Sequence, residues 1–360
     1  MSSALPEATP VTSRHRPVRR AAFAVAAALL LPAVAACGSD DGGSDGGGSG
    51  EELVIYSGRN EELVAPLLER LEEATGTDVT VRYGDSAELA AQILEEGERT
   101  NASLFFSQDA GALGALANEG VLTELPQATL DRVDPAFRAE DGTWVGLSGR
   151  VRVVVYNPDQ VSEEELPSDL DELTESRWNG QVGYAPTNAS FQTFVTAMRL
   201  IDGEDATRAW LEGIQDNGAQ AYENNITIMD AVDNGEIALG LVNHYYWFER
   251  VAEEGEDQVT AQLHHLPGDG PGSLVNAAGV GILAHGGQGE AAQEAVDFLL
   301  SEEAQTYFAE ETKEYPLAAG VTSPVEGLPP LESLETPEID LGDLDSLQET
   351  LALLQDVGML

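Results

Sequence analysis

The hydrophobic and polar positions of this chain change their period repeatedly from residue 53 onward. Short apolar runs such as 53–56 are typical of buried strands, whereas 61–75 has its leucines at helical spacing. The apolar runs predict strands at 53–56, 79–83, 104–106, 151–156, 182–184, 237–242 and 279–283. The helical spacing predicts helices at 61–75, 86–96, 191–201, 205–215, 226–234, 290–300 and 303–311, and an acidic helix within 167–180. Strands separated by helices of this length predict an α/β fold in which helices cover both faces of a parallel sheet.

The pattern also predicts two lobes. The β-branched strand at 151–156 follows the polar stretch LSGR, and we interpret this step as a crossing into a second lobe. We therefore expect a first lobe of 51–150 to which 277–325 returns, and a second lobe of 151–276 on which 326–360 packs. Leucines at 341, 344, 347, 351 and 354 predict an amphipathic C-terminal helix. Two α/β lobes joined by extended crossings form a hinge, and the ligand is expected in the cleft between them.

The first fifty residues have the composition of an export signal. A positive patch, RHRPVRR, precedes sixteen small or apolar residues, which are too few for a membrane span. The exit VAAC resembles the bacterial lipobox, in which the cysteine is lipidated, so we expect a signal peptide over 1–36 and an anchor at Cys37. The alternatives are a chance cysteine in an uncleaved anchor and twin-arginine export. Residues 37–50 are rich in Gly, Ser and Asp and predict a flexible tether.

Composition narrows the possible partners. Beyond residue 36 the chain has 63 acidic and 13 basic residues, so it should repel nucleic acid and anionic lipid headgroups. Cys37 is the only cysteine, which excludes a disulfide scaffold and a multi-cysteine metal site.

Two segments carry candidate ligand chemistry. The first is VNHYYW at 242–247, where a predicted strand becomes a helix and both Tyr245 and Tyr246 can face a cleft. Phenolate is a hard anionic donor, and a highly charged cation such as Fe(III) can displace its proton. The alternative is an ordinary aromatic cluster at a helix start. The second segment is YAPTNAS at 184–190, which leads into a helix start and forms either an anion site or a plain N-cap by Asn188 or Ser190.

Several blocks together resemble the periplasmic ferric-ion-binding proteins of ABC importers. These blocks are VIYSGRNEE, FFSQDAGAL, WVGLSGRVRVVVYN, WNGQVGYAPTNASF, AVDNGEIALGLVNHYYW and EYPLAAGV, in this order over about residues 53–320. The resemblance implies a two-lobed, type II periplasmic-binding fold, a monomeric protein and delivery to a membrane permease from the outer face of the cytoplasmic membrane. It implies Tyr245 and Tyr246 as iron ligands, together with a synergistic anion such as phosphate or carbonate. The positions that match the family's anion site are Asn188, Ala189, Ser190, Asn225 and Asn243.

The first-lobe half of the family's metal site is altered in this chain. Asn60 stands where many members have a histidine, and Gln108 stands where they have a glutamate. An amide oxygen is a poorer ligand for Fe(III) than a carboxylate. Three explanations stay open: the tyrosines hold iron with an anion and water, Glu61 or Asp109 substitutes, or the ligand is an iron chelate, an oxyanion or a small organic anion.

No motif supports an enzyme. The chain contains no HExxH, P-loop or GxSxG pattern. An extracellular hydrolase using Ser148 or Ser190 lacks an assignable base. Of Arg150 and Arg152, we expect one to line the cleft and neutralise an anion and the other to be structural. His244 is expected to face away from the tyrosine pair.

Overall fold

The computed structural model describes residues 52–360. The predicted signal peptide over 1–36, the anchor at Cys37 and the tether over 37–50 lie outside the described residues. Within residues 52–360, no helix has both the length and the apolar character that a membrane crossing requires.

The first lobe is built on a parallel core of three strands. β1 (Leu53–Ser57) lies between β2 (Val79–Tyr83) and β3 (Leu104–Ser107) and pairs with both in parallel register. β9 (Val275–Ile282) returns from the second half of the chain and pairs antiparallel with β3. The helices of this lobe are α1 (Glu61–Thr75), α2 (Ser86–Glu96), α3 (Ala110–Asn118), the short α4 (Gln127–Leu130), α9 (Gly289–Leu299) and α10 (Glu302–Glu310).

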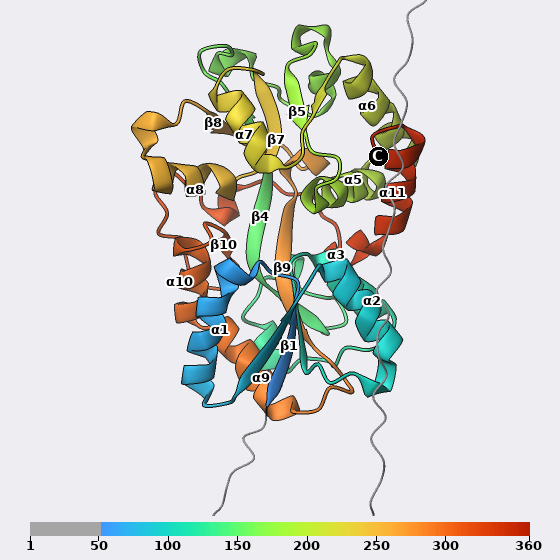
Figure 1. Ribbon diagram of the computed structural model, residues 1–360, viewed down its shortest axis with the longest axis vertical. Helices are drawn as coiled ribbons and strands as arrows, with labels where there is room; N and C mark the ends of the chain where they lie inside the picture. The colour runs from blue at the N-terminus through green and yellow to red at the C-terminus, as the bar shows by residue number, and fades with distance from the viewer. Residues whose placement is uncertain (1–51) are drawn as a thin grey trace, which may run out of the picture. The chain divides into compact units, whose positions relative to one another are not determined.

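One long strand, β4 (Trp144–Tyr156), belongs to both lobes. All thirteen of its residues are buried. Its first part, from Trp144 to Val151, pairs with β9, and its second part, from Arg152 to Tyr156, pairs with β7 (Leu239–Asn243). Figure 1 shows β4 and β9 running side by side from one lobe into the other. The two crossings expected for a hinge are therefore adjacent strands of one continuous sheet.

The prediction placed the beginning of this strand at 151, and the structure moves it back to Trp144. The reason lies in two glycines that break the apolar pattern. A Cβ at Gly146 would lie 2.7 Å from the carbonyl oxygen of Phe137, and a Cβ at Gly149 would lie 3.1 Å from Leu317. Close packing by distant segments, rather than hydrophobicity, explains these two positions.

The second lobe has a smaller mixed sheet. β5 (Val182–Tyr184) pairs in parallel with β7 and with β6 (Gln220–Ala221), while β8 (Gln262–His264) pairs with β4. β10 (Tyr315–Pro316) pairs with β4 at Gly149 and Ser148, beside the crossing. The helices of this lobe are α5 (Ala189–Ile201), α6 (Glu204–Asp216), α7 (Asn225–Asp233) and α8 (Tyr245–Glu254).

Two predicted helices are wrong in part. The segment 167–180 forms two 3₁₀ turns, Asp171–Thr174 and Ser176–Trp178. The Asn217 side chain accounts for this, because its amide donates to the carbonyls of Leu173 at 3.3 Å and Glu175 at 2.7 Å.

The C-terminal leucines do not form one helix. They form a 3₁₀ turn, Leu341–Asp345, and then α11 (Leu347–Asp356). Gly342 explains the break, because its backbone packs directly on Gly114 of α3, where a Cβ would lie 2.0 Å from the Gly342 carbonyl oxygen. The turn thus contacts α3 of the first lobe, whereas α11 packs on α5 of the second.

Candidate metal centre

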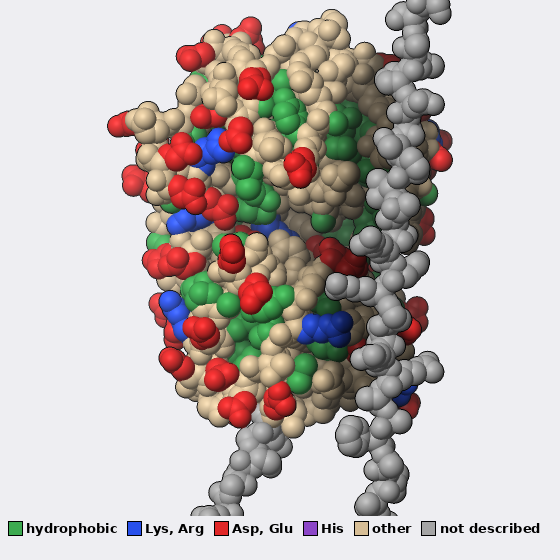
Figure 2. Space-filling model, in the orientation of Figure 1, with side chains coloured by type: hydrophobic (Ala, Val, Ile, Leu, Met, Phe, Trp, Pro, Cys, Tyr) green, Lys and Arg blue, Asp and Glu red, His purple; other side chains and the backbone are tan. Residues whose placement is uncertain are grey.

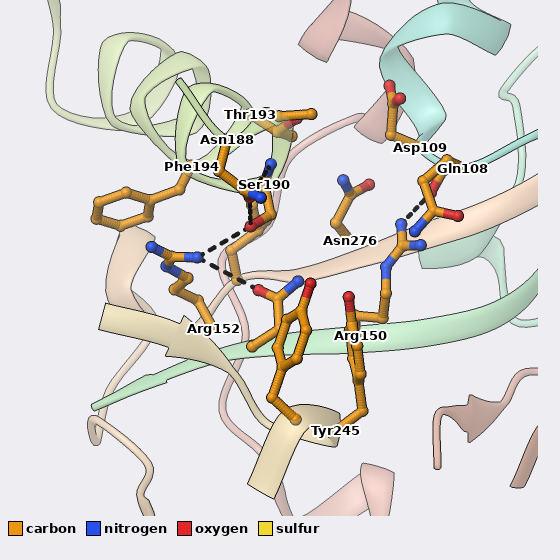
Figure 3. A pocket seen from close by; sticks show the side chains of 14 residues that line it. Gln108, Asp109, Arg150, Arg152, Asn188, Ser190, Thr193, Phe194, Tyr245 and Asn276 are labelled. Atoms are coloured by element: carbon orange, nitrogen blue, oxygen red, sulfur yellow. Dashed lines mark hydrogen bonds between the residues drawn. The ribbon is translucent and has the colours of Figure 1, made fainter. Parts of the chain in front are cut away.

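A cavity of about 140 Å³ lies where the two lobes meet the crossing strands. Gln108 and Asp109 line it from the first lobe, and Arg150 lies on β4. Ser190 at the start of α5 and Tyr245 at the start of α8 line it from the second lobe (Figure 3). Asn276 of β9 also lines the cavity, which thus brings together residues from five parts of the chain, and its position agrees with the predicted cleft.

The tyrosine pair stands at the junction of β7 and α8. β7 ends at Asn243, His244 makes the turn, and Tyr245 is the first residue of the helix. The Tyr245 and Tyr246 rings lie 4.3 Å apart between centroids, inclined by 30°, and both line the cavity. This is more than a packed aromatic cluster, because two phenols from consecutive residues reach the same space.

The surroundings of Tyr245 keep its phenol protonated. Burial raises the pKa of Tyr245 well above its usual value, and the neighbouring Tyr246 adds to this shift, while the positive charge of Arg150 opposes it. A metal that binds this oxygen must displace the proton, so metal binding and proton release are linked.

Arg152 is the arginine that faces the anion segment. Its guanidinium donates to Ser190 Oγ at 3.2 Å (Figure 3) and to Asn243 Oδ1 at 3.5 Å. It also donates to the Leu241 carbonyl at 2.9 Å. It is 3% exposed, and within residues 52–360 it forms no ion pair with a carboxylate. Burial lowers the pKa of Arg152 to about 9. Burying a charge without a partner is costly, so an anion bound in the cavity would stabilise Arg152.

The start of α5 forms the predicted N-cap and also lines the cavity. Asn188 is the N-cap, and its Oδ1 accepts from the Ser190 amide at 3.0 Å and from the Ser190 hydroxyl at 2.6 Å. Asn188, Ala189 and Ser190 also line the cavity. The capping interaction holds the positive end of the helix dipole toward this space.

Asn225 supports this segment without lining the cavity. Its amide donates to Asn188 Oδ1 at 3.3 Å and to Ser190 Oγ at 3.2 Å. Its own Oδ1 is buried and has no partner among the described residues. Of the five positions matched to the family's anion site, four line the cavity and Asn225 lies behind them.

The four tentative first-lobe residues divide into two pairs. Gln108 and Asp109 line the cavity; burial raises the pKa of Asp109, although a bond from the Ala112 amide and the charge of Arg150 lower it. Asn60 and Glu61 are exposed and do not line it; the Asn60 side chain caps α1 by accepting from the Glu62 amide at 2.8 Å. Across 52–360, no three His, Cys, Asp or Glu side chains gather in a metal-binding group.

Sequence reasoning missed a buried charge cluster behind the cavity. Glu314 accepts from Arg59 through both oxygens, at 3.2 and 2.9 Å, and lies 3.6 Å from Arg150. Ser148 also donates to this carboxylate. Arg59, Arg150 and Glu314 are each at most 5% exposed. Burial alone would raise the pKa of Glu314, but the two arginines lower it below its usual value. The EYPLAAGV block contains Glu314, yet nothing in its local pattern indicates these partners.

His244 and the two serines considered for a hydrolase are hydrogen-bonded within the fold. His244 is fully buried, and Nδ1 accepts from the Val151 amide at 3.2 Å while Nε2 lies 3.0 Å from the Lys313 carbonyl. Burial lowers the pKa of His244 to about 3, so the ring is neutral. Both nitrogens have backbone partners, and the ring does not line the cavity that the tyrosine pair lines. Ser148 and Ser190 are hydrogen-bonded to Glu314 and Arg152 respectively, and among the described residues neither forms a hydrogen bond with a histidine.

Known proteins resemble this chain over most of its length. The family model described as bacterial extracellular solute-binding protein matches residues 100–337. The Fe(3+)-binding periplasmic protein of Serratia marcescens is 32% identical over 309 residues, covering 86% of this chain and 90% of that protein. Iron-bound HitA from Pseudomonas aeruginosa superposes with a TM-score of 0.79 at 34% identity, covering 86% of this chain and 99% of that one. The Trichodesmium protein in complex with iron and citrate superposes with a TM-score of 0.75 at 26% identity, covering 85% and 99%.

These comparisons confirm the resemblance stated from the sequence and the α/β periplasmic-binding fold. They also agree with the absence of an enzyme motif, because the similar proteins are solute-binding proteins. The chain belongs to the family of bacterial extracellular solute-binding proteins.

Proposed function

We propose that this protein captures ferric iron together with a synergistic anion, phosphate or carbonate, and delivers it to the permease of an ABC importer. One observation carries the proposal: two phenols and a buried arginine that has no carboxylate partner in the described part of the chain line the same cavity. Tyr245 and Tyr246 would supply phenolate oxygens, while Arg152 and the start of α5 would hold the anion. The printed names of the similar proteins support iron as the solute.

The charges of such a site are complementary. Two phenolates neutralise part of the charge of Fe(III), and an anion held by Arg152 can fill further coordination positions. Asp109 offers one carboxylate from the first lobe. Burial raises its pKa, and a cation bound in the cavity would stabilise its charged form. Gln108 offers only an amide oxygen, which is a poorer ligand for Fe(III) than a carboxylate. We therefore place Gln108 at the edge of the site.

A second candidate ligand is an iron chelate such as iron citrate. One observation on the first-lobe side of the cavity favours it. Gln108 lines the cavity there, whereas Asn60 and Glu61 do not. A chelate brings its own oxygen ligands and therefore needs fewer from the protein. The solved relative with iron and citrate is consistent with this alternative.

Loading experiments separate these ligands. The iron-free protein should be loaded with ferric iron in the presence of phosphate, bicarbonate or citrate, and its metal content and visible spectrum recorded. We expect retained iron and a phenolate-to-iron charge-transfer band with phosphate or bicarbonate. A band only with citrate would favour the chelate, and tight binding of phosphate without metal would favour an oxyanion. A colourless protein without retained iron under all conditions would exclude an iron function.

The site should release iron on acidification. Burial holds the pKa of Tyr245 well above its usual value, so iron binding must displace a proton, and protons compete with iron for the oxygen. We expect affinity to fall about tenfold per pH unit for each proton released on binding. The loss of the charge-transfer band during an acid titration measures this. An affinity that does not change between neutral and mildly acidic pH would contradict phenolate coordination.

Removing the charge of Arg152 should weaken anion binding. Arg152→Gln keeps a hydrogen-bond donor near Ser190 but loses the cation, and a hydrogen bond to a charged group contributes about 1.5–3 kcal/mol. We therefore expect phosphate-dependent iron retention to fall by about 10- to 100-fold. Arg208→Gln, at an exposed ion pair with Asp356, is the matched control. Equal retention in both variants would show that Arg152 does not hold the anion.

We also propose that the protein is exported and anchored to the outer face of the membrane by lipid on Cys37. The VAAC exit directly after the apolar run supports this. In the native host, Cys37→Ser should move the protein from the membrane fraction to the soluble fraction. An unchanged distribution would contradict the anchor.

A further inference from the structure

Two arginine–asparagine pairs follow each other on one face of the crossing strands. In the ladder between β4 and β9, Arg150 pairs with Asn276. In the ladder between β4 and β7, Arg152 pairs with Asn243. Residues opposite each other in a ladder project to the same face, and so do residues two apart on one strand. All four residues line the candidate metal centre, but only Asn243 is among the positions matched to the family's anion site.

The protein fixes the orientation of the Asn276 side chain. Its Oδ1 accepts from the backbone amide of Ala277 at 2.8 Å and from that of Ala110, the first residue of α3, at 3.4 Å. The side-chain nitrogen is a donor and cannot take this position opposite two N–H groups. In Figure 3 the oxygen is accordingly turned to the side of Gln108, and the nitrogen to the side of Ser190.

The amide nitrogen of Asn276 is an available donor. Nδ2 forms no hydrogen bond with residues 52–360, and it is not among the unpaired side-chain atoms that are shut off from solvent. Asn276 as a whole is only half-buried. Asn243 has the same arrangement: its Oδ1 accepts from Arg152 at 3.5 Å, while its Nδ2 has no partner in the described part of the chain. Both asparagines therefore keep two N–H groups for a ligand in the cavity.

The chemistry of this donor favours an anion. An amide N–H group donates and cannot coordinate a cation, so its partner in the cavity is an acceptor oxygen. Arg152 adds a positive charge that no carboxylate within residues 52–360 pairs with. Arg150 differs, because Glu314 lies 3.6 Å from it and compensates its charge. The cavity thus combines one uncompensated cation with a neutral donor on β9, and this combination fits an oxyanion.

We propose that Asn276 is a further anion-binding residue, which donates from β9 to an oxygen of the anion that Arg152 and the start of α5 hold. The inference rests on the proposed function, since it concerns the anion that accompanies ferric iron. Donors from β9, β4 and α5 suit a tetrahedral oxyanion such as phosphate, because its oxygens face in different directions. A planar carbonate that binds iron through two oxygens keeps only one for the protein.

Two substitutions separate an anion contact from a structural contact. Asn276→Asp keeps an oxygen for the Ala110 and Ala277 amides, but it replaces the donor by a second acceptor and adds a negative charge. Asn276→Ala removes both functions. We expect Asn276→Asp to lower phosphate affinity by about 10- to 100-fold, because a hydrogen bond to a charged group is replaced by repulsion. Asn276→Ala should lower it less, whereas a purely structural role requires the opposite order.

Calorimetric titration of the iron-free protein with inorganic phosphate and with bicarbonate measures these affinities. Iron retention is unsuitable as the readout, because the new carboxylate of Asn276→Asp can itself coordinate iron. Asn101→Asp is the matched control: Asn101 is exposed, does not line the cavity and accepts from the Tyr56 hydroxyl at 3.1 Å. This variant adds the same charge, keeps an oxygen for its partner and should retain wild-type phosphate affinity.

The outcomes decide the role of Asn276. Unchanged phosphate affinity in Asn276→Asp, or a greater loss in Asn276→Ala than in Asn276→Asp, would overturn the proposal. A wild-type protein that binds no phosphate without iron would overturn it as well, and tighter binding of bicarbonate than of phosphate would overturn the choice of a tetrahedral anion. Because the titrations use no iron, failure of this inference and failure of the ferric site are distinguishable.

Discussion

Tyr245→Phe and Tyr246→Phe should each reduce ferric-ion affinity by at least about 100-fold. Loss of a group outside the coordination shell of a metal typically costs 10- to 100-fold, and loss of a ligand should cost more. Each substitution removes one hydroxyl and keeps the ring, so the 4.3 Å ring contact between the two residues and the start of α8 should persist. The charge-transfer band should weaken or vanish in each variant, and equilibrium competition with a chelator gives the change in affinity.

The control for these variants is Tyr222→Phe. Tyr222 lies in the same lobe, is half-buried and does not line the cavity. It should retain wild-type iron affinity. If Tyr245→Phe or Tyr246→Phe also retained it, that tyrosine would not be a ligand. If the anion alone still bound normally to both variants, the anion segment would function without the metal. Four of the five matched anion-site residues line the cavity, which is compatible with that outcome.

Glu314→Gln should lower the free energy of unfolding by about 3–5 kcal/mol. Removing one member of a buried ion pair leaves the other charge uncompensated, and here the carboxylate serves both Arg59 and Arg150. Glutamine can accept a hydrogen bond but brings no charge. Chemical denaturation of the iron-free protein measures the difference, and Glu311→Gln, an exposed neighbour, is the control. A difference of less than about 1 kcal/mol would show that the cluster contributes little to stability.

The same cluster predicts a pH dependence. Because the folded pKa of Glu314 lies below its ordinary value, its contribution is present above the unfolded pKa and is lost as pH falls through the folded value. Wild-type stability should therefore decline on acidification, and this part of the decline should be missing in Glu314→Gln. The two curves should converge at low pH.

Most of the elements could be predicted because their signals are local. The helix at Glu61–Thr75 was predicted to the residue, since its leucine spacing is a signal contained within one segment. The strands Val79–Tyr83 and Val182–Tyr184 also agree. The errors arose where contacts with distant parts of the chain determined the local structure. The segment 167–180 forms 3₁₀ turns whose carbonyls accept from Asn217, and the C-terminal helix is interrupted where the Gly342 backbone packs on Gly114.

The candidate site divides in the same way. The Tyr245–Tyr246 pair and the Asn188–Ser190 cap are contiguous in the chain, so the sequence alone identified them and the family resemblance gave them a role. The sequence did not show which arginine faces the anion segment, because this depends on the register of β4 against β7. In that register Arg152 pairs with Asn243. Gln108 and Asp109 line the cavity, whereas Asn60 and Glu61 do not. This difference depends on the relative positions of α1 and α3, which only the tertiary structure shows.

The sequence by itself therefore determined the order of strands and helices, the segments that carry the candidate oxygen ligands and the family of the protein, because each depends on neighbours along the chain. The tertiary structure alone decided that β4 joins both lobes, that Arg152 lies beside the phenols with no carboxylate partner within residues 52–360, and that Glu314 holds Arg59 and Arg150. These are contacts across as many as 255 residues of chain. The desolvation that raises the pKa of Tyr245 and lowers that of Arg152 exists only once those segments have packed together.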